Sequence, residues 1–233
     1  VKAGQASEAR LDQSVRRILI QKFEQGLFEN PYVDPAAAAR IVGSPAFRAE
    51  GRAAQARSLV LLERKANAPK FAAGTRVSLH GVDAAAASAH GLVVVDAPEK
   101  AQAAIVRTGA PHQVLHPTYL FGLMQHEGDL DFKDGDKDYE AIKAISAKVP
   151  TVVSVFLDRP AILTGIKDRA ALLIGDFGVS DEALLDVLTG KARAEGRLPF
   201  ELPSSMLAVN AQASDKPYDS KEPLYRFGYR LEP

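Results

Sequence analysis

Cysteine is absent from the 233-residue sequence, and this absence excludes disulfides, thiolate nucleophiles and cysteine-held zinc or iron–sulfur sites. An excess of charge of one sign is also lacking, because 29 lysines and arginines balance 29 aspartates and glutamates. With no net charge and no basic run, the composition predicts neither nucleic acid nor an anionic membrane surface as a partner.

Long apolar runs are missing as well. The apolar blocks are short and strand-like, such as residues 92–95, whereas a membrane-spanning helix needs about 20 apolar residues. The chain begins at Val1 with a charged amphipathic segment in place of the apolar core of a signal peptide. We therefore expect no membrane partner, and we expect further sequence upstream of Val1 in the natural protein.

The first part of the sequence predicts one amphipathic helix. Apolar residues recur at helical spacing over residues 11–28, and Gly26 and Pro31 close the segment. No neighbouring segment offers an obvious surface for this apolar stripe. We therefore expect the helix to pack on something outside this chain.

A linker and a second helix follow. Residues 30–35 contain two prolines, which favour an extended connection. Ser44 and Pro45 have the residue types of a helix cap and a first-turn proline, and an Ala-rich helix is predicted from there to about Arg57. The domain boundary is therefore placed near Ser58, which gives domains of residues 1–57 and 58–233.

Beyond Ser58, short β-branched or Leu-rich blocks alternate with helical or polar stretches. Blocks that are apolar on both faces are typical of central parallel strands covered by helices on either side. The alternation predicts an α/β fold, a mostly parallel sheet of about six strands between helices, with ligands beyond the carboxyl ends of the strands. The predicted strands are residues 58–62, 76–80, 92–95, 104–108, 151–157 and 171–174, and the predicted helices are 83–90, 137–148 and 180–189.

A long loop, residues 109–136, interrupts this alternation, and a loop of that length in a compact domain is usually functional or disordered. His112 and His116 have the spacing of a helical zinc-ligand pair, but prolines at 111 and 117 disfavour a helix there. No metal site is predicted. The loop concentrates polar groups: His112, His116, His126, Glu127, Asp129 and Asp131.

Other common site chemistries find no support in the sequence. There is no G-x-S-x-G motif for a catalytic serine, and Gly81 and Gly91 are not spaced as a nucleotide-binding loop. No cofactor is therefore expected. Carboxylate chemistry remains, with Glu127 as a possible general acid or, on the simpler interpretation, a solvated loop glutamate.

Five strings, in order along the chain, resemble glycoside hydrolases of family three. Residues 12–35, DQSVRRILIQKFEQGLFENPYVDP, are similar to the segment that closes the barrel of that family and begins the linker to its second domain. Residues 56–62 resemble the first strand of the second domain. Later strings similar to its signatures are Asp158-Arg159-Pro160, Gly190-Lys191 with Gly196-Arg197-Leu198-Pro199, and Phe227-Gly228-Tyr229 with Leu231.

The resemblance implies the C-terminal part of a retaining, exo-acting β-glycosidase that hydrolyses β-glucosides or short β-glucans. It implies a preceding (β/α)8 barrel, missing here, that carries the nucleophilic aspartate. A second carboxyl group must then lie roughly 5–5.5 Å from that nucleophile. The family commonly supplies it from a second-domain loop that resembles Glu127-Gly128, so Glu127 is the candidate acid/base, with His126 and Asp129 as candidate substrate-binding residues.

The sequence departs from the family pattern at two points that bear on this assignment. In plant relatives the acid lies in the loop before the last helix, and Ser180 occupies that place here, which argues against that site. The family often has an arginine shortly after the Glu-Gly pair, where this chain has Leu130-Asp131-Phe132. The alternative function is therefore a non-catalytic carbohydrate-binding or barrel-stabilising module. Asp158 and Arg159 fit a structural ion pair or strand-end cap better than a sugar clamp. Relatives are often exported, so the resemblance favours a periplasmic or extracellular location.

Overall fold

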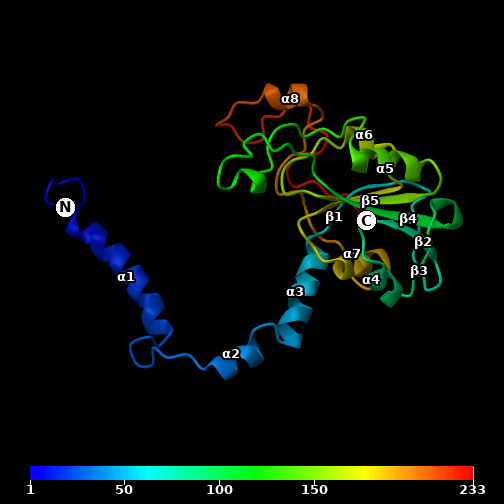
Figure 1. Ribbon diagram of the computed structural model, residues 1–233. Coiled ribbons are helices and arrows are strands. Elements are labelled where there is room, and N and C mark those ends of the chain that lie inside the picture. Colours follow the sequence, from blue (N-terminus) through cyan, green and yellow to red (C-terminus); the bar gives the residue numbers. More distant parts are fainter. Residues whose placement is uncertain (233) are drawn as a thin grey trace. The chain divides into compact units, whose positions relative to one another are not determined.

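The computed structural model describes residues 1–232, which form two compact units that divide between Arg48 and Ala49 (Figure 1). The first unit holds two helices, α1 (Glu8–Glu24) and α2 (Pro35–Ile41). The side chain of Ser7 caps α1 by accepting a hydrogen bond from the backbone N–H of Arg10. Asp34 caps α2 in the same way, because it accepts from the N–H of Ala36.

Helix α1 has no buried residue. Its apolar side chains are widely exposed, 51% for Val15 and 60% for Phe23. That this stripe packs on something outside the chain stays a prediction. The sequence predicts an extended linker through Pro35, and this prediction is wrong at its end, because Pro35 occupies the first helical position of α2 after its Asp34 cap.

Helix α3 (Pro45–Ser58) leads into the second unit and agrees with the predicted helix. The boundary between the compact units lies within this helix, after Arg48, whereas the sequence placed a domain boundary at its end, near Ser58. The last turns of α3 belong to the second unit for a physical reason. Ala56 is buried in its core, and the side-chain oxygen of Gln55 accepts a hydrogen bond from the N–H of Ser180.

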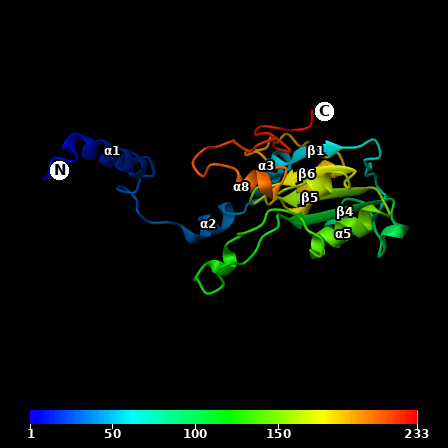
Figure 2. The same cartoon turned by 90° about the horizontal axis from the view of Figure 1, so that it is seen from above.

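The second unit is built on one six-stranded sheet with the strand order β1-β6-β5-β4-β2-β3 (Figures 1 and 2). All neighbouring pairs are parallel except β1 and β6, which run antiparallel. The mostly parallel α/β fold predicted from the sequence is confirmed. The strands are β1 (Val60–Arg64), β2 (Arg76–His80), β3 (Val93–Val94), β4 (Ala103–Gly109), β5 (Thr151–Phe156) and β6 (Leu172–Asp176).

Helices cover both faces of the sheet, which gives three layers (Figure 1). Helices α4 (Ala84–Ala89) and α7 (Asp181–Leu188) pack with the end of α3 on one face. Helices α5 (Lys137–Ser146) and α6 (Thr164–Lys167) lie on the other. The central strands β4 and β5 are therefore buried on both sides, as their continuous apolar runs predicted. A short helix α8 (Met206–Asn210) lies in the C-terminal segment.

The C-terminal segment covers the outer edge of the sheet at β1. The backbone N–H of Leu231 donates to the carbonyl of Leu61 at 2.8 Å. The hydroxyl of Tyr229 donates to the carbonyl of Leu62 at 3.2 Å, and the hydroxyl of Tyr225 donates to the carboxylate of Glu63 at 2.9 Å. The C-terminal segment thereby covers part of the outer edge of β1, which is the outermost strand of the sheet.

Candidate active site

The predicted functional loop leaves the carboxyl end of β4 and folds back on itself. The backbones of Gln113 and Glu127 form an antiparallel bridge, in which the N–H of Gln113 donates to the carbonyl of Glu127 at 2.9 Å and the reverse bond measures 3.3 Å. Residues 113–127 therefore form a closed projection, called here the acid loop, with one 3-10 turn (Gly122–Met124) near its end. Figure 2 shows it extending away from the sheet after β4.

Glu127 stands at the base of the acid loop, and 28% of its side chain is exposed. Its carboxyl Oε2 lies 2.7 Å from Nδ1 of His116, which belongs to the outgoing arm of the loop. When Glu127 is ionised, the Nδ1–H of His116 donates to it; when Glu127 is protonated, its O–H donates to Nδ1. The carboxyl group is thus positioned by one partner and remains open to solvent.

The backbone around Glu127 is held from a different strand end. The guanidinium of Arg159 donates to the carbonyl of Glu127, and also to the carbonyl of Gly128 at 2.8 Å. Gly128 has φ of 70°, and a Cβ atom there would lie 2.1 Å from the side-chain oxygen of Gln113. Glycine is favoured at this position because its positive φ would strain any residue with a side chain, whereas the Gln113 side chain could move aside.

His126 is held beside Glu127 by two contacts. Its Nδ1 is hydrogen-bonded to the carboxylate of Asp158, and its ring stacks on that of His112, with centroids 3.8 Å apart and planes inclined by 11°. Asp158 and Arg159, expected to act structurally at a strand end, do so by holding the acid loop. The helical-spacing pair of His112 and His116 forms no helix, and its two members have separate partners.

Asp129 lies just beyond the loop and is engaged through both carboxylate oxygens. One oxygen accepts a hydrogen bond from the N–H of Asp131 at 2.9 Å, and the other forms an ion pair with Lys133. The hydrogen bond from Lys133 lowers the pKa of Asp129. Burial, together with the charge of Asp129, raises the pKa of Asp131. Asp129 is therefore a stable anion, held by Lys133 and by the backbone of Asp131.

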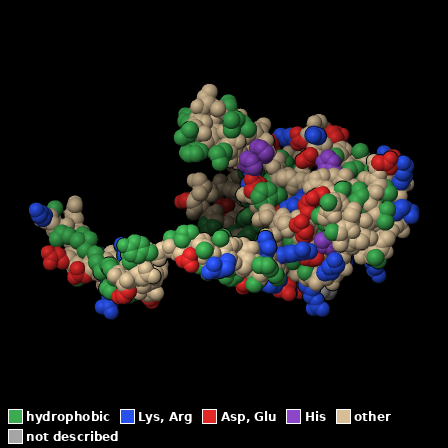
Figure 3. Space-filling model, turned by 60° about the horizontal axis from the view of Figure 1, so that its bottom comes forward, with side chains coloured by type: hydrophobic (Ala, Val, Ile, Leu, Met, Phe, Trp, Pro, Cys, Tyr) green, Lys and Arg blue, Asp and Glu red, His purple; other side chains and the backbone are tan. Residues whose placement is uncertain are grey.

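The far end of the acid loop is apolar and exposed. Figure 3 shows hydrophobic side chains gathered on a projecting lobe, with histidines near its base. Such a group of apolar side chains is typical of a surface that meets another protein surface. The exposed members are Val114, Leu115, Tyr119, Leu120, Phe121, Leu123 and Met124, of which Leu120 is 89% exposed.

The sequence nominates Glu127, His126 and Asp129 but does not indicate the residues that hold them. It suggests His116 only as a possible metal ligand, and it does not connect Asp158 and Arg159 to the loop. Local patterns carry little information on these contacts, because the partners are 11 and 32 residues apart. The topology gives one indication. The acid loop follows β4, and Asp158 and Arg159 follow the parallel strand β5, so both lie at the carboxyl edge of the sheet.

The three-layer fold and its carboxylate–histidine loop define an α/β domain that presents an acid group at the carboxyl ends of parallel strands. The sequence matches the model of the glycosyl hydrolase family 3 C-terminal domain over residues 24–232. The chain therefore belongs to glycosyl hydrolase family 3, as the resemblance of its sequence motifs predicted.

Named relatives agree with this membership. The chain is 49% identical over 231 residues to a periplasmic beta-glucosidase/beta-xylosidase of Dickeya chrysanthemi, covering 99% of this chain and 35% of that protein. It is 40% identical over 235 residues to beta-glucosidase C of Emericella nidulans, covering all of this chain and 37% of that protein. The chain thus spans about a third of the length of these relatives.

Solved structures agree on the fold. A beta-glucosidase from Listeria innocua in complex with glucose superposes with a TM-score of 0.69 at 18% identity, covering 99% of this chain and 39% of that one. An exo-1,3/1,4-beta-glucanase from a Pseudoalteromonas species gives 0.68 at 22% identity, covering 99% of this chain and 34% of that one. In residues 1–232, no helix has the length and apolar character needed to cross a membrane.

Proposed function

We propose that this chain is the C-terminal part of a retaining, exo-acting β-glycosidase, a β-glucosidase or β-glucan exohydrolase, and that Glu127 is its general acid/base. The observation that carries the proposal is the setting of Glu127 in a family 3 domain. Its carboxyl group is partly exposed, hydrogen-bonded to His116, and fixed through its backbone by Arg159. The names of the relatives, beta-glucosidases and a beta-glucosidase/beta-xylosidase, support a β-glycoside substrate.

In the proposed mechanism, Glu127 acts twice and a barrel aspartate outside this chain acts as nucleophile. In the first step the aspartate attacks the anomeric carbon while Glu127 transfers its proton to the glycosidic oxygen, so the leaving group departs as an alcohol. In the second step the Glu127 carboxylate takes a proton from water. The water oxygen then displaces the aspartate and releases the sugar with its original anomeric configuration.

We assign His126 and Asp129 to the rim of the substrate site. The Nδ1 of His126 is engaged by Asp158, so its contact with a sugar hydroxyl runs through Nε2. Asp129 is an anion held by Lys133, and a carboxylate readily accepts hydrogen bonds from hydroxyl groups. Neither residue needs to transfer a proton in this assignment.

The proposal divides the chain into residues 1–57, the final barrel helix with the linker, and residues 58–233, the C-terminal domain. The exposed apolar face of α1 and the apolar end of the acid loop support a further domain that covers them. The share of the relatives that this chain spans, about a third, supports the same view. We also propose a periplasmic or extracellular location, supported by the periplasmic relative.

The chain by itself is predicted to show no turnover of an aryl β-glucoside above the rate without enzyme. The reason is that acid/base catalysis by Glu127 has no effect without a nucleophile on the opposite side of the sugar. Hydrolysis is measured by release of the aryl alcohol, with the full-length enzyme as positive control. Turnover by the chain at the rate of the full-length enzyme would refute the assignment of the nucleophile to another domain.

A further inference from the structure

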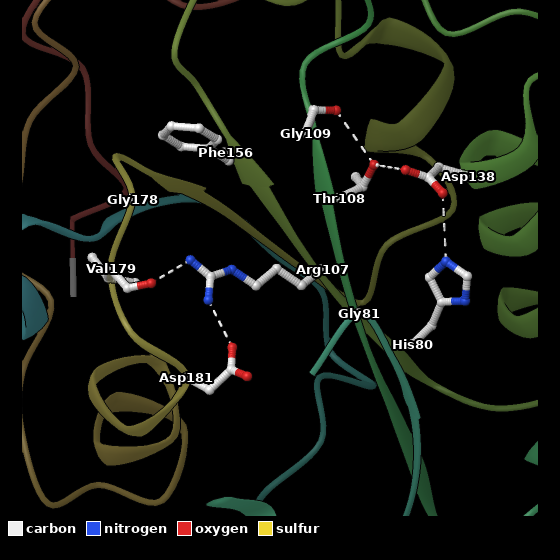
Figure 4. A pocket seen from close by; sticks show the side chains of 10 residues that line it. All are labelled: His80, Gly81, Arg107, Thr108, Gly109, Asp138, Phe156, Gly178, Val179 and Asp181. Atoms are coloured by element: carbon white, nitrogen blue, oxygen red, sulfur yellow. Dashed lines mark hydrogen bonds and ion pairs between the residues drawn. The ribbon is translucent and has the colours of Figure 1, made fainter. Parts of the chain in front are cut away.

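A pocket of about 590 Å³ opens at the carboxyl ends of the parallel strands, beside the start of the loop that leads to Glu127 (Figure 4). Its volume lies within the range of small-molecule sites, roughly 300–1,000 Å³. The walls come from the ends of β2, β4 and β5 and from the beginnings of α5 and α7. The lining residues are His80, Gly81, Arg107, Thr108, Gly109, Asp138, Phe156, Gly178, Val179 and Asp181.

The pocket lies where the order of the strands reverses. From β2 the chain continues outward to β3 and then returns to β4 on the other side of β2. The connections after β2 and β4 lead to α4 and α5, which cover opposite faces of the sheet. Such a divergence opens a crevice between the two strand ends, where α/β proteins bind their ligands. At Gly81 a Cβ atom would lie 2.3 Å from the carbonyl oxygen of Arg107, so a side chain there would disrupt this wall.

Arg107 lies in the pocket, but its charge is directed inward. Its guanidinium lies 2.7 Å from a carboxylate oxygen of Asp181 and 3.4 Å from the buried carboxylate of Asp176, and it also donates to the carbonyl of Val179. Burial opposes the charged form of Arg107, but these carboxylates outweigh it and raise its pKa. The lining holds two carboxylates, Asp138 and Asp181, and the guanidinium charge of Arg107 is already balanced by Asp181 and by Asp176 buried behind the wall. The pocket therefore disfavours anions such as phosphate.

The opposite wall offers hydrogen-bonding groups suited to hydroxyls. Asp138 accepts a hydrogen bond from Thr108 at 2.6 Å, lies 3.5 Å from Nε2 of His80, and has 45% of its side chain exposed. A carboxylate has about four acceptor positions, so Asp138 retains capacity for donors from a ligand. The imidazole of His80, 29% exposed, can donate or accept beside it.

An aromatic ring completes the pocket on the side of β5. Phe156 lines the cavity next to Gly178, where a Cβ atom would contact the ring at 3.4 Å. Figure 4 shows Phe156 on the side of the cavity away from His80 and Asp138. A sugar has two kinds of surface, its hydroxyl groups and its apolar C–H face. Asp138 and His80 suit the hydroxyl groups, and the ring of Phe156 suits the C–H face.

We propose that this strand-end pocket binds one neutral sugar unit, with Asp138 and His80 accepting and donating hydrogen bonds to its hydroxyls and Phe156 contacting its C–H face. A second cavity shares Thr108, Gly109 and Asp138 with the pocket and extends to His112. His112 stacks on His126, next to Glu127. The next step rests on the proposed role of Glu127. Because the acid lies on the leaving-group side of the bond, the pocket receives the leaving-group portion of an oligosaccharide.

The test is a titration of the 15N-labelled 233-residue chain with glucose and cellobiose, followed through its amide NMR signals. Saturable shifts are expected at Gly81, Gly109 and Gly178. Asp138→Ala is expected to weaken binding about 10-fold or more, because it removes hydrogen bonds to a charged acceptor. His80→Ala, which leaves α5 intact, is the second variant and is expected to weaken binding as well.

Two comparisons separate this site from the acid/base assignment. Glu127→Gln is expected to bind cellobiose as the unmodified chain does, so binding can persist even if Glu127 proves non-catalytic. Inorganic phosphate is expected to cause no saturable shift. The proposal is overturned if neither sugar shifts the pocket signals, if the shifts lie only in the acid loop, or if phosphate binds there in preference to sugar.

Discussion

Glu127→Ala in the full-length enzyme should lower kcat/KM for alkyl β-glucosides by about 10²- to 10⁴-fold, the usual contribution of a general acid. Poor leaving groups depend on the proton that Glu127 supplies to the glycosidic oxygen. Aryl glucosides with acidic phenols need no proton to depart, so their first step is retained while hydrolysis of the glycosyl-enzyme slows. Steady-state rates on the two substrate types measure this difference.

Added azide distinguishes lost proton transfer from lost structure. Azide attacks the glycosyl-enzyme without a general base, so it should restore turnover of the activated substrate in the alanine variant and yield a β-glycosyl azide. Glu127→Gln keeps a hydrogen-bonding group near His116 but has no proton to transfer, and it should show the same loss. Glu99→Ala, which removes an exposed carboxylate paired with Lys148, is the matched control and should retain full activity.

Unchanged kinetics in Glu127→Ala would contradict the acid/base role. That outcome would support the alternative function, in which the domain binds carbohydrate or stabilises the barrel without taking part in catalysis. A loss of activity that azide does not relieve would also count against Glu127 as acid/base, because the defect would then lie outside the proton transfer.

Asp176→Ala should reduce the free energy of unfolding of this chain by about 3 kcal/mol, as expected when one partner of a buried ion pair is removed. The carboxylate of Asp176 is fully buried and accepts from Ser154 at 2.8 Å, from the N–H of Gly178 at 3.0 Å, and from Arg107 at 3.4 Å. Its removal leaves the Arg107 charge with Asp181 as its remaining carboxylate partner. The predicted decrease in the free energy of unfolding is therefore at the lower end of the range of about 3–5 kcal/mol for breaking a buried ion pair.

Urea unfolding followed by circular dichroism measures this loss. The matched control is Asp96→Ala, which removes a carboxylate whose side chain is 76% exposed and paired with Lys100. Exposed pairs contribute little, so its transition should coincide with that of the unmodified chain. An Asp176→Ala transition that also coincided would show that the buried network contributes nothing to stability, contrary to the prediction.

The fold was predictable from the sequence because its central strands are covered on both faces. Full burial makes β4, β5 and β6 continuous apolar blocks, and their observed ends lie within two residues of the predicted ones. The N-cap of α7 was also readable, since Ser180 accepts from the N–H of Ala183 as expected. Helix α2 was missed because its proline fits either an extended linker or a first helical turn.

The candidate site was less predictable than the fold, for a physical reason. The family resemblance of a short string nominates Glu127 as a candidate, but its partners come from distant parts of the chain that only the folded loop brings together. Arg107 lies inside the apolar strand β4 and is itself an indication of such distant contacts. A charged residue inside an apolar strand must find buried partners, and this requirement alone indicates a polar network at that strand end.

The covered edge of β1 also bears on how this domain is made. Tyr225 and Glu63 bond across 162 residues of sequence, and Leu231 pairs with Leu61 near the end of the described chain. During synthesis β1 leaves the ribosome well before the segment that protects it. The nascent chain must therefore hold an open strand edge throughout translation of the domain, and contacts so distant in sequence close slowly. Protection by a chaperone would matter most in that interval.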